Sequence, residues 1–272
     1  MESLSEKYAR LKSMLYDFNS LIVAYSGGVD SALLLRVAYE VLGSKVLAVT
    51  ADSPSVPRRE IAEAQRLAKS IGARHLVMPT EEIQDSHYVA NSANRCYFCK
   101  RELYSKLAEI ARRERIRYIA NGTNVDDLGD WRPGLQAAAE YQVVSPLKEA
   151  GFTKADVRTL AKRLHLEVWD KPASPCLASR IPYGQTVTPR KLAAVEAAED
   201  YLRSLGLVEL RVRHFGKKAR IETRKPDFSL VEQNYSQISQ RFRMIGFEEI
   251  ELTEFKSGAL NAILKLSTDD AD

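Results

Sequence analysis

The stretch LIVAYSGGVDS at residues 21–31 decides the fold of this chain. Its first five residues are apolar and predict a buried strand, and the apolar spacing from Ser31 to Leu42 predicts the helix that follows. Gly27 and Gly28 lack Cβ atoms, so backbone N–H groups can approach an oxyanion closely, and the helix N-terminus adds about half a positive charge. The stretch therefore predicts an anion site at the carboxyl end of the first strand, where open α/β sheets bind ligands.

Short apolar segments alternate with helical segments beyond that stretch. Alternation of this kind implies βαβ units, so we predict an α/β fold in which helices cover both faces of a parallel sheet. The further expected strands are 45–50, 74–78, 118–121 and 143–147, and the further expected helices are 58–71 and 99–115.

A second, smaller region follows a proline-rich loop. Residues 170–189 hold four of the ten prolines and are expected to form the linker. We predict a first domain over residues 1–180 and a C-terminal α+β domain over residues 181–272. Within the latter we expect helices at 190–205 and 228–245 and strands at 208–215, 219–223 and 249–255.

Composition limits the class of protein. The 272 residues are 45% hydrophobic and 28% charged, which excludes a disordered chain. The formal charge of +4 suits anionic ligands but lacks the concentrated basic field of a dedicated nucleic-acid binder. The apolar runs are far shorter than the ~20 residues that span a bilayer, and residues 1–10 hold no apolar signal segment, so we expect a cytoplasmic protein.

The phosphate loop at 26–31 has no lysine after its glycines, which excludes the GxxxxGK[ST] loop. Its spacing resembles the PP-loop, SGGxDS, of the ATP pyrophosphatases, which release pyrophosphate and leave AMP on an activated substrate. The resemblance implies that Ser26 and Ser31 contact phosphate and that Asp30 helps to hold Mg²⁺. The alternative is a structural Gly-Gly turn that Asp30 caps.

Two further strand ends carry polar residues. Gly122, Asp127 and Arg132 follow a later strand, where clustered carboxylates suit Mg²⁺ and an arginine offers charge to a phosphate or carboxylate. An ordinary turn is the alternative for this segment. Thr50 begins the segment at which PP-loop enzymes receive adenine, mostly through backbone contacts. Arg58 is expected either to reach a phosphate or to be a solvated first-turn residue.

The three cysteines favour a metal or reactive-thiol role, since their number is odd and a reducing compartment disfavours disulfides. Cys96 and Cys99 form a CxxC pair without a second pair, and a zinc site needs four ligands. Three thiolates with one open coordination position suit a [4Fe-4S] cluster. Cys176 lies in a loop beside Arg180, whose charge favours the nucleophilic thiolate. Buried, purely structural cysteines are the alternative.

Together these motifs resemble the LarE family, the ATP-dependent pyridinium-3,5-biscarboxylic acid mononucleotide sulfurtransferases. The resemblance covers essentially the whole chain. It rests on SGGVDS at 26–31, GTNVDDLGDWRPG at 122–134, SPCLASRIPYG at 174–184, RVR at 211–213 and RIE at 220–222.

The resemblance implies a step in the synthesis of the nickel-pincer nucleotide. Such enzymes use ATP and Mg²⁺ to adenylylate a substrate carboxylate, and sulfur then replaces AMP to give a thiocarboxylate. It also implies a homo-oligomer whose Arg180, Arg211, Arg213 and Glu222 grip the phosphate of the mononucleotide substrate. For the two strand arginines the alternative is the exposed face of an alternating strand.

The number of cysteines leaves the sulfur source open. In single-cysteine members the residue that matches Cys176 surrenders its own sulfur and becomes dehydroalanine. With Cys96 and Cys99 as well, this chain resembles the three-cysteine type, in which a [4Fe-4S] cluster carries an extra sulfide. Cys176 is then a cluster ligand, a sulfur donor, or both.

Three other functions compete with this one. A PP-loop tRNA thiolase with an iron-sulfur cluster needs a basic groove for RNA, which a charge of +4 does not indicate. A PP-loop amide synthetase needs none of the three cysteines. A nucleotide-sensing module would hold AMP without cleaving ATP, and a measurement of pyrophosphate release in the presence of substrate would exclude it.

Overall fold

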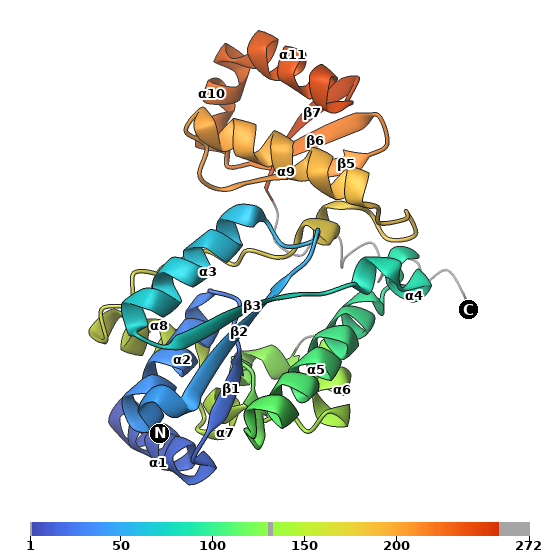
Figure 1. Cartoon of the computed structure of the whole chain (residues 1–272). Helices are drawn as coiled ribbons and strands as arrows, with labels where there is room; N and C mark the ends of the chain where they lie inside the picture. The colour runs from blue at the N-terminus through green and yellow to red at the C-terminus, as the bar shows by residue number, and fades with distance from the viewer. Residues whose placement is uncertain (1, 130–132, 256–272) are drawn as a thin grey trace, which may run out of the picture. The chain divides into compact units, whose positions relative to one another are not determined.

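The computed structural model describes residues 2–129 and 133–255 and divides them into two compact units (Figure 1). The first unit contains Met1–Glu82 and Cys96–Ser174, and the second contains Ile83–Arg95 and Pro175–Asp272. The chain therefore passes between the units at three points, one of them just before Pro175, whereas the sequence prediction placed a single boundary after residue 180.

The first unit is built on a four-stranded parallel sheet with the order β3-β2-β1-β4. In β1, Leu21 and Val23 pack into one core and Ile22 packs into another on the opposite face. This alternation confirms the predicted sheet with helices on both faces. The strands are β1 Leu21–Ala24, β2 Val46–Asp52, β3 Arg74–Pro79 and β4 Tyr118–Ala120.

Two layers of helices cover this sheet (Figure 1). Apolar side chains of α1, α2, α3 and α8 share one core, and those of α5 and α6 share the other. The α-helices are α1 Leu4–Phe18, α2 Val29–Leu42, α3 Arg58–Ile71, α5 Arg95–Glu114, α6 Gly134–Glu140, α7 Pro146–Glu149 and α8 Lys154–Arg163. Short 3₁₀ helices are η1 Gly43–Lys45, η2 Glu82–Gln84 and η3 Val125–Gly129.

The strand expected at 143–147 is wrong. Only Val144 makes a bridge, to Ala120, and Pro146 then begins the helix α7. Proline has no N–H for a ladder and is favoured at the first position of a helix, which explains the difference. The helix α8 was not predicted, although Thr153 and Asp156 form a capping box at its start.

The second unit is a mixed three-stranded sheet with helices. β5 and β6 are antiparallel, whereas β6 and β7 are parallel, so the expected βαβ-like connection joins the last two strands. The helix predicted over 228–245 is two helices that meet at Asn234, whose side chain donates to the Leu230 carbonyl (2.8 Å). The elements are α4 Ser86–Val89, η4 Leu177–Arg180, α9 Pro189–Ser204, β5 Leu210–Phe215, β6 Lys218–Thr223, η5 Lys225–Asp227, α10 Phe228–Gln233, α11 Tyr235–Ile245 and β7 Glu249–Glu254.

Residues 83–95 belong to the second unit because two buried side chains bind its loops. Asn91 donates to three carbonyls within residues 181–185 (2.7–3.2 Å), and Arg95 donates to the Ala178 carbonyl (3.0 Å). Throughout residues 2–129 and 133–255, every helix is too short or too polar to cross a lipid bilayer.

Candidate active site

The phosphate loop joins β1 to α2 as the sequence predicts. Gly27 has a φ of +74°, and a Cβ on it would lie 3.0 Å from the Cβ of Ala64 in α3, so only glycine fits this turn. The Ser26 and Ser31 hydroxyls lie 3.2 Å apart, and the Ser31 hydroxyl donates to the Gly28 carbonyl (3.1 Å). Two hydroxyls and the N-terminus of a 14-residue helix therefore meet at the predicted anion site.

The loop after β4 packs directly against this site. A Cβ on Gly122 would lie 2.8 Å from the backbone nitrogen of Ser31 and 3.1 Å from the carbonyl carbon of Asp30. β4 and β1 are paired neighbours in the sheet, so their carboxyl ends bring residues 121–127 and 26–31 together. Glycine at 122 is thus required by the close approach of two backbones.

Asp30 faces two donors from this neighbouring loop and helix. Its carboxylate forms an ion pair with the Lys154 ammonium and accepts a hydrogen bond from the Asn124 side-chain amide (3.0 Å). It does not act as the expected alternative, a cap of the Gly-Gly turn. Asp127 accepts the backbone N–H of Asn124 (2.9 Å) and so holds the loop in shape. The side chain of Arg132 lies outside the described residues.

Lys154 and Asn124 are site residues that sequence reasoning missed. Asn124 stands inside the motif at 122–134, but the carboxylates beside it are the usual ligands of Mg²⁺ and were predicted in its place. Lys154 begins α8, and its backbone N–H donates to Asp126 (2.7 Å), so the helix start is tied to the same loop. The Thr153 capping box was the available signal for this helix, although not for its contact with Asp30.

Thr50 is buried at the end of β2. Its hydroxyl donates to the Tyr25 carbonyl (2.8 Å) and lies 2.8 Å from Nε2 of His75, whose pKa is lowered by burial. The Thr50 side chain therefore links β2 to Tyr25 and to β3, and the expected backbone contact of this segment with adenine stays a prediction.

Arg58 begins α3 and holds the turn that precedes it. Its guanidinium pairs with the Asp52 carboxylate and donates to the carbonyls of Ser53 and Val56, the latter at 2.8 Å. The side chain is 51% exposed, as the prediction of a solvated first-turn residue has it, and it also shapes the end of the strand. A contact between Arg58 and a phosphate stays a prediction.

Cys96 and Cys99 lie in the first turns of α5. Residues three apart share a helix face, so the exposed Cys96 and the half-buried Cys99 form one pair of thiols. Among the described residues, no three His, Cys, Asp or Glu side chains form a group that could hold a metal ion. Cys176, the third thiol, belongs to the second unit.

The loop that carries Cys176 is held by a buried arginine. Arg180, whose side chain is 3% exposed, donates to the carbonyls of Pro175 (2.8 Å) and Cys176 (3.3 Å) and to the carboxylate of Glu199 (2.8 Å). The structure thus gives Arg180 a place inside the protein, where it shapes the cysteine loop. Its expected contact with a substrate phosphate stays a prediction.

Arg213 and Glu222, the other expected phosphate residues, pair with each other (3.0 Å), and Arg213 also donates to the Ser179 carbonyl (2.8 Å). Both are almost completely buried. Arg211 is half-buried, with its guanidinium 4.5 Å from the centre of the Phe255 ring. Burial, together with the charges of Arg180 and Arg213, lowers the pKa of Arg211. The carboxylates of Glu222 and Glu199 oppose this shift, because they pair with Arg213 and Arg180.

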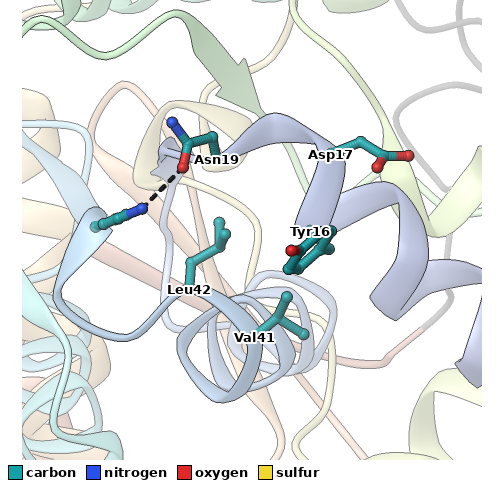
Figure 2. Close-up of a pocket in the computed structure, with 6 residues that line it drawn as sticks. Tyr16, Asp17, Asn19, Val41 and Leu42 are labelled. Carbon is teal, nitrogen blue, oxygen red and sulfur yellow. Dashed lines mark hydrogen bonds between the residues drawn. The ribbon is translucent and has the colours of Figure 1, made fainter.

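A hollow of about 430 Å³ lies elsewhere in the first unit (Figure 2). Asn19 and Lys45, which are hydrogen bonded to each other (2.8 Å), line it just before β1 and β2. The hollow is therefore at the amino edge of the sheet, whereas the phosphate loop is at the carboxyl edge. Its other lining residues are Tyr16, Asp17, Val41 and Leu42.

Comparisons with known proteins decide the family. Residues 20–167 match the family model of the argininosuccinate synthase N-terminal HUP domain. The pyridinium-3,5-bisthiocarboxylic acid mononucleotide synthase of Lactiplantibacillus plantarum is 38% identical over 270 residues, which cover 97% of both chains. The chain belongs to the LarE family.

Two other matches fit this assignment. An uncharacterised protein of Synechocystis is 43% identical over 265 residues, or 96% of this chain and 99% of its own. The argininosuccinate synthase of Pyrococcus furiosus is 26% identical over 166 residues, which cover 56% of this chain and 40% of that one. The match to argininosuccinate synthase is limited to part of the chain, whereas the first two matches extend through both units. These full-length matches do not favour the alternative function, a tRNA thiolase.

Proposed function

We propose that this LarE-family protein is an ATP-dependent sulfurtransferase that converts carboxylates of pyridinium-3,5-biscarboxylic acid mononucleotide to thiocarboxylates. The product is an intermediate of the nickel-pincer nucleotide. The full-length match to the synthase of Lactiplantibacillus plantarum carries the proposal. The phosphate loop, with its hydroxyl pair and helix N-terminus, supports the use of ATP.

The first step is adenylylation. A carboxylate is a poor electrophile, because attack on it must expel an oxide-like group. A substrate carboxylate oxygen therefore attacks the α-phosphorus of ATP, pyrophosphate leaves, and the acyl group now carries AMP as a good leaving group. In this step Ser26, Ser31 and the amides at the start of α2 bind phosphate oxygens.

Mg²⁺ suits the carboxylate of Asp30, because Mg²⁺ is usually bound by one or two carboxylates together with substrate phosphates. Lys154, which pairs with this carboxylate here, would share it with the ion. Asp30 would hold the ion, which would supply positive charge to the ATP phosphates. Asn124 orients the carboxylate through its amide, and Gly122 lets the loop that carries Asn124 approach. Arg132 is proposed to add charge from the same loop.

Sulfur replaces AMP in the second step. In the sacrificial route, the Cys176 thiolate attacks the acyl carbon and AMP leaves. Loss of the Cα proton then breaks the Cβ–Sγ bond, so the sulfur stays on the substrate and residue 176 becomes dehydroalanine. Arg180 donates hydrogen bonds to the carbonyls of Pro175 and Cys176, and these bonds fix the backbone that carries the thiol.

The catalytic route uses a cluster instead. Cys96 and Cys99 fit a pair of cluster ligands because they share the accessible start of one helix, and Cys176 would be the third. A [4Fe-4S] cluster held there would supply an open iron for a sulfide that is passed to the substrate.

Arg211 is the residue of the second unit that we propose for the substrate phosphate. Burial is the main cause of its lowered pKa, and the charges of Arg180 and Arg213 add to it, so a phosphate would find a poorly solvated cation there. Arg213 and Glu222 pair with each other across β5 and β6. A homo-oligomer and a cytoplasmic location complete the proposal; three thiols suit a reducing compartment.

One pair of variants tests the two steps. Asp30→Ala should abolish pyrophosphate release while the circular dichroism spectrum stays that of the wild type. Cys176→Ala should still release pyrophosphate with substrate and yield no thiocarboxylate. A Cys176→Ala variant that forms thiocarboxylate contradicts both sulfur routes through this residue.

A second measurement separates the routes. Protein isolated without oxygen is analysed for iron and sulfide, and its intact mass is measured before and after turnover. The cluster route predicts bound iron and an unchanged mass, whereas the sacrificial route predicts the loss of one H₂S per chain.

A further inference from the structure

The linker that leads to Cys176 is fastened to α3 by side chains of the first unit. Lys171 donates to the carboxylates of Glu60 (2.7 Å) and Glu63 (2.5 Å), and the Ser174 hydroxyl donates to the second oxygen of Glu60 (3.0 Å). We call these four residues the linker latch. Glu60 is its centre, because it holds two points of the linker at once.

The centre of the latch, Lys171 and Glu60, is mostly sheltered from solvent, whereas Glu63 and Ser174 lie at its exposed edge. The side chains of Lys171 and Glu60 are 18% and 12% exposed. Burial alone would lower the pKa of Lys171, but the hydrogen bonds to Glu60 and Glu63 outweigh it and the pKa is raised. Lys171 is therefore charged at neutral pH, and its contacts are charge-assisted hydrogen bonds, which are stronger than those of an exposed pair.

The backbone of the linker is held from another helix as well. Arg158 of α8 donates to the carbonyls of Trp169 (3.1 Å) and Lys171 (3.0 Å). Pro172 and Pro175 flank Ser174 closely and restrict the φ angles of the chain there. Up to Ser174, therefore, α3 binds the side chains of the linker and α8 binds its backbone.

The latch stands on the helix that packs under the phosphate loop. Ala64, against which Gly27 packs, lies one helical turn after Glu60 on α3. Cys176 follows Ser174 by two residues, a span of at most ~7 Å along an extended chain. The anchor point of the cysteine segment is therefore tied to the same helix as the phosphate loop.

We propose that Glu60 is a positioning residue for sulfur transfer, because the latch sets the point from which Cys176 is presented to the adenylylated substrate. The inference rests on the proposed function and deepens it. Glu60 binds neither ATP nor sulfur in this scheme. Release of the latch leaves adenylylation intact and slows the step that needs Cys176.

The test uses the full chain in single-turnover reactions with ATP and the biscarboxylic mononucleotide. Pyrophosphate release reports the first step, and thiocarboxylate formation reports the second. In Glu60→Ala the second rate should fall about tenfold or more while the first stays within about twofold, since small misplacement of a reacting group is costly. Glu60→Gln, which retains an acceptor for Ser174, should fall between Glu60→Ala and wild type.

Arg66→Ala is the matched control. Arg66 lies on the same helix and pairs with Glu167 ahead of the linker (2.5 Å), but both side chains are more than half exposed. Both of its rates should equal those of the wild type. Hydrogen exchange of the peptide over residues 168–176 should quicken in Glu60→Ala and not in the control.

The outcomes distinguish the inference from the function. A wild-type protein that forms no thiocarboxylate overturns the proposed function and the latch with it. If the wild type is active and Glu60→Ala transfers sulfur at the same rate, only the latch is overturned. Equal losses of pyrophosphate release and sulfur transfer would also overturn it, because Glu60 would then act on the nucleotide site.

Discussion

The ammonium of Lys154 contacts the carboxylate of Asp30, although 124 positions of sequence separate the two residues. The phosphate loop contains no lysine, so this contact brings a positive charge to its edge from the start of α8. The Lys154 side chain is 41% exposed, and its backbone is fixed by a hydrogen bond to Asp126. Lys154 thus stands where the charge of a bound polyphosphate needs compensation.

Replacement of Lys154 by Met should weaken ATP binding. A charge-assisted contact to phosphate contributes roughly 1.5–3 kcal/mol, so the KM for ATP should rise at least about tenfold. Lys154→Arg should restore most of the affinity. Lys162→Met is the control, because this lysine of the same helix lies over the Trp169 ring (4.3 Å). An unchanged KM in Lys154→Met would remove Lys154 from the ATP site.

Gly122→Ala should damage the phosphate loop through sterics alone. The added methyl group would lie 2.8 Å from the backbone nitrogen of Ser31, so backbone must move, and overpacking of this kind costs about 1–3 kcal/mol. We expect that loss in urea unfolding, together with weaker ATP binding in a titration. In the control Gly134→Ala the methyl group would lie 2.9 Å from Cγ of Lys100, and a side chain moves more easily than backbone, so both effects should be smaller than those of Gly122→Ala. Equal effects of the two substitutions would argue against the close approach at Gly122.

Local signals in the sequence were sufficient for the framework of the first unit. The helix over 58–71 was predicted with its exact bounds, because its apolar spacing is regular and Gly72 ends it with a φ of +87°. The strand, glycine loop and helix around residues 21–42 were likewise predicted, since a short apolar run followed by two glycines has few other solutions.

Contacts between distant segments were not predictable in this way. Lys154 gives no local sign that it meets Asp30, since that contact depends on how α8 packs against the sheet. The family resemblance implied that Arg180 and Arg213 bind a substrate phosphate, and that role stays a prediction. Their pairing with Glu199 and Glu222 inside the protein was not predictable, because only the tertiary structure brings these residues together.

Glu199 is the acid on which the cysteine loop depends. It is 1% exposed and accepts hydrogen bonds from Arg180 (2.8 Å), Arg203 (2.9 Å) and the backbone N–H of Val212 (3.1 Å). Glu199→Ala leaves a buried guanidinium uncompensated, so we expect a loss of about 3–5 kcal/mol in the free energy of unfolding.

The control for Glu199 is Asp200→Ala, whose carboxylate is 52% exposed and lies 3.6 Å from Arg203. An exposed pair of this kind contributes little, so the change should stay below about 1 kcal/mol. Urea unfolding monitored by circular dichroism measures both variants. A Glu199→Ala protein as stable as Asp200→Ala would show that Arg180 finds other compensation.

His75 should make the stability of the first unit depend on pH. Burial lowers its pKa, so the unfolded chain takes up a proton at a higher pH than the folded one does. The folded state binds fewer protons in that window, and the free energy of unfolding therefore falls as the pH drops below about 6.5. The loss levels off once the pH is below the pKa of the folded state.

His75→Gln should flatten this dependence, because glutamine does not titrate and its amide can still donate to the Thr50 hydroxyl, which His75 contacts at 2.8 Å. Unfolding by urea is measured for both proteins between about pH 7 and pH 5, the window in which a histidine of lowered pKa acts. His214, whose pKa burial also lowers, gives the second unit a separate contribution that His214→Gln removes. Each variant should reduce the slope of the free energy of unfolding against pH. The reduction in the double variant should equal the sum of the two, since the residues lie in different units. If the free energy of unfolding of His75→Gln depends on pH as steeply as that of the wild type, another group takes up the proton on unfolding. Thr50 then does not hold a neutral imidazole.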